Sequence, residues 1–228
     1  RFFASEPTDT TPQFQIYLPL YNGVEKFEIG TTDGAELKAL PARGSVRKPI
    51  VCYGTSIMHG ACSSRPGMAW PSIVGRMLDR EVINFGFSGN GRMELEVGQY
   101  LAELDPAIFV IDCLPNMSPD QVAKRTQPLV RQLRAARKDT PILLVEDRTF
   151  TNAWFYKSKL VEHEQRRKAL RGAFDALQGD GVAGLHYLNG DLLLGRDGEG
   201  ATDGSHPNDL GMMRQAEVVT GSLRPLLR

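Results

Sequence analysis

VCYGTSIMHGACSS, residues 51–64, sets the pattern from which the fold is predicted. An apolar run ends at Gly54 and is followed by Thr55, Ser56 and a loop of small residues. Similar runs recur along the chain, rich in Val and Ile and bounded by Pro or Gly, each too short for a helix and typical of a buried strand. They are PIVCYG (49–54), EVINFGF (81–87), AIFVIDCL (107–114), PILLVED (141–147) and GLHYLNG (184–190).

Helical patterns lie between and after these runs, and we expect helices over residues 69–79, 92–104, 119–138, 157–178 and 208–226. Ser118-Pro119-Asp120-Gln121 is a typical helix start, with Ser as N-cap, Pro at the first position and Gln completing a capping box. Strands alternating with helices predict an α/β fold, a three-layer, doubly wound parallel sheet of about five strands. In such sheets ligands bind beyond the carboxyl ends of the strands.

Residues 1–46 have a different pattern from the rest of the chain. QFQIYLPL (13–20) and VEKFEIG (24–30) alternate apolar and polar residues, and Asn22-Gly23 between them is a typical hairpin turn. A lone hairpin is marginal in water, so we expect it either to pack on the main domain or to be the end of a larger β-domain. Residues 41–45 have the composition of a linker. The sequence therefore predicts a β segment over 1–46 and an α/β domain over 47–228.

The composition excludes several classes of partner. The 228 residues include 27 Lys and Arg and 27 Asp and Glu, so no net field favours nucleic acid or an anionic membrane. No Lys/Arg cluster is interleaved with aromatic residues, and no run approaches the ~20 apolar residues of a membrane span. We therefore expect neither a nucleic-acid partner nor a membrane span.

Three cysteines argue against a disulfide framework but do not fix the compartment. Cys52 and Cys113 lie in apolar runs and are expected to be buried. The sequence opens on Arg1 without a signal-peptide pattern, so we expect a processed or truncated chain. An exported, periplasmic or extracellular, bacterial protein is compatible with these features.

Polar residues follow the predicted strands at the edge where a ligand would bind. They are Ser56, the turn Gly86–Gly91, Asn116, and the pair Asp203 and His206 before the last helix. A serine hydroxyl becomes a good nucleophile when an imidazole takes its proton, and the imidazole needs a carboxylate to orient it. Acyl transfer also needs donors aimed at the developing oxyanion, and the amides of Ser56 and Gly89 and the Asn116 side chain are available.

At these positions the sequence resembles a known family. The order Gly-Thr-Ser-Ile, Phe-Ser-Gly-Asn, Leu-Pro-Asn and Asp-Gly-Ser-His resembles the four blocks of the SGNH (GDSL-type) hydrolases, over residues 48–226. These are esterases, lipases, carbohydrate deacetylases and a few acyltransferases. The resemblance implies a flavodoxin-like three-layer sheet and no cofactor. No His/Cys spacing in the sequence matches a metal site, so we expect no metal. The resemblance also implies the site residues: Ser56 as nucleophile, His206 as base, Asp203 as its partner, and Gly89 and Asn116 completing the oxyanion hole.

Two blocks depart from the usual family pattern. Thr55 stands where the first block usually has Asp, Ile57 where it has Leu, and Met117 follows Asn116 where Asp is usual. Neither replaced acid belongs to the triad, so the departures indicate a divergent branch. That branch resembles members with a β-sandwich before the hydrolase domain, which would make residues 1–46 part of an accessory domain.

Each candidate residue also has a structural interpretation. A serine after a strand is more often a helix cap, but the four blocks together favour the nucleophile at Ser56. His59 is expected at the pocket rim as a substrate contact. Arg92 is either a substrate contact or a surface charge. Trp154 and Tyr156 either stack on a substrate or pack on the following helix.

The sequence thus predicts a cofactor-independent serine esterase acting on a small-molecule or carbohydrate ester. We expect a short acyl group, such as acetate, because the first block is divergent and no long apolar lid segment is present. Two alternatives stay open: an acyltransferase with the same nucleophile, and a non-catalytic ligand-binding domain. The intact set of five site residues argues against the second.

Overall fold

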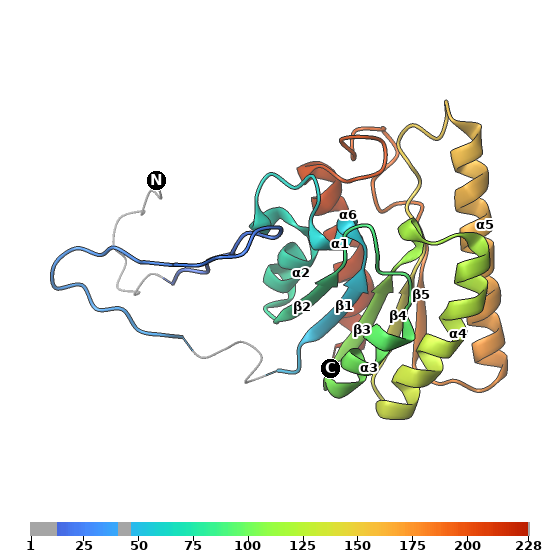
Figure 1. Cartoon of the computed structure of the whole chain (residues 1–228), viewed down its shortest axis with the longest axis horizontal. Coiled ribbons are helices and arrows are strands. Elements are labelled where there is room, and N and C mark those ends of the chain that lie inside the picture. The colour runs from blue at the N-terminus through green and yellow to red at the C-terminus, as the bar shows by residue number, and fades with distance from the viewer. Residues whose placement is uncertain (1–12, 41–46, 228) are drawn as a thin grey trace.

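A computed structural model describes residues 13–40 and 47–227 and contains the predicted parallel sheet. Its order, β2-β1-β3-β4-β5, is that of a flavodoxin-like fold, whose topological switch point lies between β1 and β3. The α/β fold prediction is therefore confirmed (Figure 1). The strands are β1 (Ile50–Gly54), β2 (Val82–Gly86), β3 (Ile108–Asp112), β4 (Ile142–Val145) and β5 (Leu185–Leu188).

Helices cover both faces of the sheet, and every predicted helix is present to within a few residues. The short α1, which begins at Ser56, follows β1 directly. Helices α3, α4 and α5 lie on one face, and α2 and α6 pack together on the other (Figure 1). Their bounds are α1 (Ser56–His59), α2 (Trp70–Leu78), α3 (Leu95–Glu103), α4 (Pro119–Ala136), α5 (Lys157–Gly179) and α6 (Asp209–Leu223).

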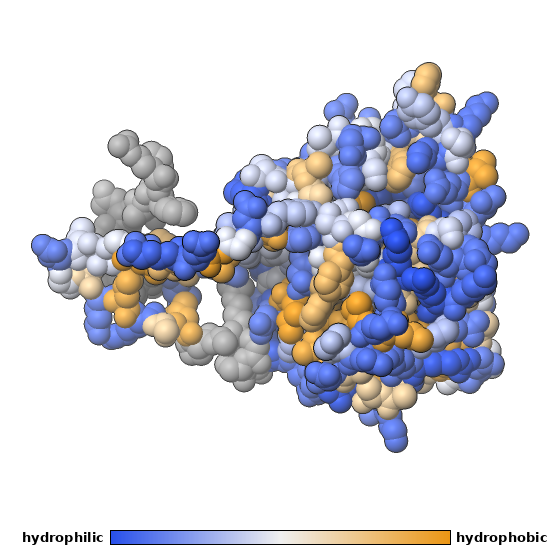
Figure 2. Space-filling model, in the orientation of Figure 1, coloured by the Kyte–Doolittle hydropathy of each residue, from blue (hydrophilic) through white to orange (hydrophobic). Residues whose placement is uncertain are grey.

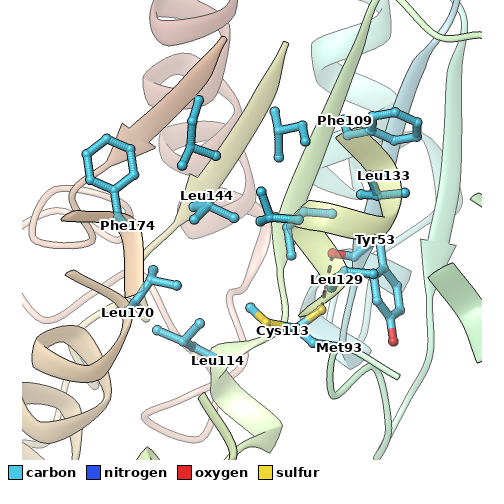
Figure 3. Close-up of a cluster of buried hydrophobic side chains, with 14 of the residues drawn as sticks. Tyr53, Met93, Phe109, Cys113, Leu114, Leu129, Leu133, Leu144, Leu170 and Phe174 are labelled. Carbon is cyan, nitrogen blue, oxygen red and sulfur yellow. Dashed lines mark hydrogen bonds between the residues drawn. The ribbon is translucent and has the colours of Figure 1, made fainter. Parts of the chain in front are cut away.

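Alternate residues of each strand enter two separate cores. Val51 and Tyr53 point to the face covered by α4 and α5, whereas Ile50 and Cys52 point to the face covered by α2 and α6. This two-residue period follows from strand geometry and explains why both faces of the central strands are apolar. Figure 3 shows part of the first core, where strand residues meet Leu129 and Leu133 of α4 and Leu170 and Phe174 of α5.

The N-terminal segment, residues 13–40, does not form the predicted hairpin. The chain reverses direction within the segment (Figure 1) and bends at residues 20–22, but none of the described residues 13–40 is in a strand. Most of its large apolar side chains are exposed, as the orange patches on the segment in Figure 2 show. Among the described residues, most of this apolar surface has no packing partner, and a lone hairpin is marginal in water, which explains the difference. The exposed side chains include Phe14, Ile16, Leu18, Val24, Phe27 and Ile29.

The predicted linker, residues 41–45, lies outside the described residues. Within the described ranges, no helix is long and apolar enough to span a membrane. Cys52 and Cys113 are fully buried, as expected from their apolar runs.

The capping box predicted at the start of α4 is present. The Ser118 hydroxyl accepts from the Gln121 amide at 3.2 Å, and the Gln121 side-chain oxygen accepts from the Ser118 amide at 2.9 Å. Pro119 occupies the first helical position, where its missing N–H costs nothing. The cap fixes the point at which the chain leaves the loop that follows β3.

We expect Ser118→Ala to lower the free energy of unfolding by about 1 kcal/mol, because it leaves a helix N–H without its acceptor. Urea unfolding followed by circular dichroism measures the change. Ser118→Asp, which retains a capping oxygen, should stay close to the wild type. Equal destabilisation by both substitutions would contradict the capping role.

Candidate active site

Ser56 lies at the carboxyl end of β1, beside the switch point of the sheet. Thr55, not Ser56, caps α1: its hydroxyl accepts from the Ile57 amide at 3.3 Å. Ser56 is the first residue of the helix and is 8% exposed. The Thr at the position where the family usually has Asp therefore has a local structural use, and the Ser56 hydroxyl is free of the capping bond.

A loop 150 residues further along the chain reaches the Ser56 hydroxyl. His206 Nε2 lies 2.9 Å from Ser56 Oγ, and His206 Nδ1 lies 2.7 Å from Asp203 Oδ2. The other Asp203 oxygen accepts from the amides of Ser205 and His206 at 2.9 and 2.7 Å. The three side chains that the sequence singled out thus form one hydrogen-bonded chain.

The loop keeps the Asp203 carboxyl ionised. Burial alone would raise the pKa of Asp203, but hydrogen bonds from the His206 amide and ring and from the Ser205 amide outweigh it and lower the pKa. Gly204 between them has a φ of +89°, a conformation that favours glycine. An ionised carboxylate on Nδ1 leaves Nε2 as the ring nitrogen that can accept a proton from Ser56.

The glycine turn after β2 packs tightly on the end of β1 and on the end of α1. A Cβ on Gly86 would lie 2.2 Å from the His59 amide nitrogen, and a Cβ on Gly91 would lie 2.0 Å from the Gly54 carbonyl oxygen. Gly89, at the turn's outer part, has a φ of +73°, and a Cβ there would meet no described atom within 4 Å. The turn is therefore held at Gly86 and Gly91, and Gly89 between them has open space where a side chain would stand.

Asn116 ends a short 3₁₀ turn, η3 (Leu114–Asn116), which follows β3. Its Nδ2 donates to the Asn90 carbonyl at 2.6 Å, which fixes the amide beside the glycine turn. An amide nitrogen carries two hydrogens, so this bond leaves the second donor available. Arg92 also holds the turn, because its Nη2 donates to the Gly89 carbonyl at 2.9 Å.

Glu94 is a residue of this region that the sequence did not indicate. Its carboxylate accepts from the Tyr53 hydroxyl and, at 2.6 Å, from the Arg92 amide. Burial tends to raise the pKa of Glu94, and the Tyr53 and Arg92 hydrogen bonds lower it below its usual value. Glu94 thereby ties the end of the glycine turn to β1. A single acid near a helix start gives no sequence signal of this role.

A buried group of charged side chains lies beneath the site and was also missed. Arg148 Nη2 contacts both Asp112 carboxylate oxygens at 2.8 Å, and Gln215 of α6 donates to the same carboxylate at 3.1 Å. Asp112 and Arg148 are 1% and 0% exposed. The only sequence signal was the charged run Glu146–Arg148 directly after an apolar strand.

Asp147 extends this charged group toward α5. It accepts from His163 Nδ1 and from Arg166 Nη1, both at 2.9 Å. Burial tends to raise the pKa of Asp147, but the His163 hydrogen bond and the nearby charges, that of Arg148 first, lower it below its usual value. Arg166 also donates through Nε to the Met117 carbonyl at 2.7 Å. Because Met117 follows Asn116, the buried group reaches the candidate oxyanion donor. His163 is buried, and its ring joins Asp147 to the Phe150 amide in the segment after β4.

The aromatic residues after β4 lie beside the loop that carries Asp203 and His206 and are exposed. The Thr151 amide donates to the Gly204 carbonyl at 2.9 Å, which places this segment next to Asp203 and His206. Trp154 and Tyr156 are 81% and 52% exposed, so neither is buried against the following helix. Their role in substrate binding stays a prediction.

Arg92 and His59, the other two predicted substrate contacts, contact other residues of the protein. Arg92 is turned toward Gly89, as described above, and His59 stacks on Tyr21 of the N-terminal segment with ring centroids 4.1 Å apart. Their substrate roles stay predictions as well.

The flavodoxin-like sheet, with Ser56, His206 and Asp203 joined at its switch point, defines the class as an α/β protein with the architecture of the SGNH hydrolases. The sequence profile of the GDSL-like lipase/acylhydrolase family matches residues 47–224. The chain therefore belongs to the GDSL-like lipase/acylhydrolase family.

Solved structures agree with this assignment. A structure described as a GDSL-like lipase from Bacteroides ovatus is 36% identical, with a TM-score of 0.87, and the match covers 92% of this chain and 62% of that one. A salicylyl-acyltransferase from a tetracycline biosynthetic pathway is 18% identical, with a TM-score of 0.68 and coverage of 80% and 56%. This chain thus spans less than two thirds of either protein.

A family two carbohydrate esterase from Clostridium thermocellum, in complex with cellohexaose, shares the fold at 16% identity. Its TM-score is 0.58, and the match covers 83% of this chain and 67% of that one. The search of curated proteins gave no match.

We expect Arg148→Met to destabilise the protein by about 3–5 kcal/mol at pH 8, because it leaves the Asp112 charge buried without its partner. Burial raises the pKa of Asp112 to about 6 even with Arg148 in place, and losing the cation raises it further. An acid whose pKa is raised by folding binds its proton more tightly in the folded state. The loss should therefore shrink as the pH falls from 8 toward 5.

Denaturant unfolding at the two pH values measures this effect. Lys124→Met serves as the control, because it removes an exposed ion pair with Asp120 on α4 and should cost under about 1 kcal/mol at both pH values. A loss from Arg148→Met that is independent of pH would show that Asp112 is not the group left unpaired.

Proposed function

We propose that the protein is a serine esterase that hydrolyses short acyl esters through Ser56, His206 and Asp203. The hydrogen-bonded chain from Ser56 Oγ to His206 Nε2, and from Nδ1 to Asp203, carries this proposal. The same order of contacts is what nucleophilic acyl transfer requires of a hydroxyl, a base and an orienting carboxylate.

In the proposed reaction, Ser56 Oγ attacks the ester carbonyl carbon while His206 Nε2 takes the hydroxyl proton. The carbonyl electron pair moves to its oxygen, which the amides of Ser56 and Gly89 and the second Asn116 N–H stabilise. The tetrahedral intermediate collapses, the alcohol leaves with the proton from His206, and an acyl-enzyme remains. Water then attacks the acyl-enzyme by the same route, releasing the carboxylic acid and restoring Ser56.

The fixed donors support this assignment because they require little rearrangement. The Gly54 carbonyl and the Arg92 guanidinium hold the two sides of the glycine turn, and Asn90 holds the Asn116 amide. Donors held in place before the reaction often lower the barrier to acyl transfer more than any other feature of an active site.

The proposed substrate is an acetyl or similarly short ester, carried on a carbohydrate or another polyol. The exposed Trp154 and Tyr156 beside the catalytic loop support this choice, since aromatic faces suit the apolar face of a sugar. The fold is shared with both a carbohydrate esterase and an acyltransferase, so water and an acceptor alcohol are both to be tested as acyl acceptors.

Labelling with a fluorophosphonate probe tests the nucleophile. We expect wild type to label and to release acetate from p-nitrophenyl acetate, and Ser56→Ala to do neither. Ser222→Ala, a matched change in α6, should behave as wild type. Labelling with acyl transfer only to an added polyol would favour the transferase. Absence of labelling in folded wild type would contradict the proposed enzyme and favour a binding domain.

We expect Asn116→Ala to lower kcat by about 10²–10³-fold with little change in KM, because the oxyanion forms only after binding. Asn116→Asp should lower kcat at least as far, since a carboxylate would repel the oxyanion. Steady-state kinetics on the same ester, with thermal unfolding to check folding, measures both. An unchanged kcat in Asn116→Ala would remove this side chain from the oxyanion hole.

A further inference from the structure

The tip of the N-terminal segment touches the hydrolase domain at the candidate active site. Figure 1 shows the segment reaching the domain beside α1 and α2. Its Tyr21 ring stacks on the His59 ring at a centroid distance of 4.1 Å and an interplanar angle of 15°. His59 is the last residue of α1, the four-residue helix that Ser56 begins.

Tyr21 also reaches the glycine turn. Its hydroxyl donates to Ser88 Oγ at 3.4 Å, and Ser88 directly precedes Gly89, the proposed oxyanion donor. One side chain from outside the α/β domain thus spans from α1 to the turn that faces it. The 3.4 Å bond is long, so the stacked ring is the stronger of the two contacts.

Close packing and a second contact point hold the segment in this place. A Cβ on Gly60 would lie 2.5 Å from Leu20 Cδ1, so Leu20 fits where α1 ends in a glycine. Further back, Arg76 of α2 donates to the Tyr17 hydroxyl at 3.0 Å and lies over the Tyr17 ring. The Tyr17 contact with α2 and the Tyr21 contact with α1 thus fix the path of the chain on either side of Leu20.

Tyr21 remains 52% exposed despite these contacts. His59 covers one part of the ring, and the rest is open to a ligand. The leaving alcohol must lie beside His206 Nε2, which protonates it. The Tyr21 side chain instead contacts α1, which begins at Ser56, and the glycine turn, which carries Gly89, so its open ring is available to the acyl portion of the ester that Ser56 attacks.

We propose that Tyr21 is a specificity-determining residue that forms one wall of the acyl site and limits the length of the acyl chain. The inference rests on the proposed function and deepens it by assigning the acyl selectivity to a residue outside the α/β domain. Removing the ring opens the wall between His59 and Ser88, so longer acyl chains gain room and apolar contact.

Two matched ester series test the proposal in the full chain. One varies the acyl group from acetyl to hexanoyl on p-nitrophenol, and the other keeps acetyl and varies the alcohol. We expect Tyr21→Ala to shift the hexanoyl-to-acetyl ratio of kcat/KM by about tenfold or more toward hexanoyl, the scale at which a pocket discriminates by methylene groups. The alcohol series should keep its order.

Tyr21→Phe should keep the wild-type ratio, since the ring and its stacking on His59 remain. Phe27→Ala is the matched control, because Phe27 is an exposed aromatic residue of the same segment. The ratio within one variant is independent of the fraction of active enzyme, so partial misfolding does not imitate the effect.

Fluorophosphonate labelling of Ser56 separates this proposal from the proposed function. If wild type labels and turns over but Tyr21→Ala keeps the wild-type acyl ratio, the proposal is overturned while the esterase stands. A change confined to the alcohol series would likewise overturn the acyl assignment. If wild type neither labels nor turns over, the esterase itself fails and the proposal falls with it.

Discussion

The Gly54 carbonyl accepts a hydrogen bond from the Phe87 amide at 2.9 Å, and the arrangement of the site depends on this contact. It joins the end of β1 to the turn after β2. The same carbonyl lies 2.0 Å from where a Cβ on Gly91 would stand, and a Cβ on Gly54 would stand 2.6 Å from the Asp112 carbonyl. Three backbones therefore meet at one point, and only glycine allows two of them to come so close.

This close approach explains how the loops at the carboxyl edge of a parallel sheet come together at the candidate site. β1 and β3 are neighbours, but the chain leaves them toward opposite faces of the sheet, so the loops that follow them meet at the switch point. Ser56 follows β1, and Asn116 follows β3. The glycine turn follows β2, the other neighbour of β1, so the candidate donors come from three loops at one edge of the sheet.

The buried charged side chains around Asp112 also hold separate loops together, on the side of the sheet that carries Asn116. Asp112 and Arg148 lie at the ends of β3 and β4, and a buried ion pair adds little net stability compared with apolar packing. In this protein the buried charged group connects elements that are far apart in the sequence. Asp147, next in the chain to Arg148, reaches Met117 through Arg166, and so links the α5 side of the sheet to the loop that carries Asn116.

The sequence predicted the parts that local chemistry determines. Strand alternation, glycine and proline boundaries and the Ser118 cap are properties of neighbouring residues, so the sheet and its helices could be derived from them. The family blocks then indicated Ser56, Gly89, Asn116, Asp203 and His206. The structure brings Ser56, Asp203 and His206 into one hydrogen-bonded chain. It also places Asn116 beside the glycine turn that contains Gly89.

Other features depend on contacts between distant parts of the chain, which no local pattern reveals. Arg148 and Asp112 are 36 residues apart, and Tyr53 and Glu94 are 41 apart. The hairpin prediction failed for a related reason. Alternation in residues 13–30 indicates a surface with one apolar face, but a strand also requires something for that face to pack on.

The proposed reacting groups and the proposed acyl-chain selectivity lie in different parts of the molecule. The family profile begins at residue 47, and all the proposed reacting groups lie within it. Tyr21 lies outside it and still touches α1 and the glycine turn. Acyl transfer needs donors held to within a fraction of an ångström, which a buried sheet edge provides. A wall that only limits size tolerates more variation, and it can therefore come from a surface segment attached at a few points.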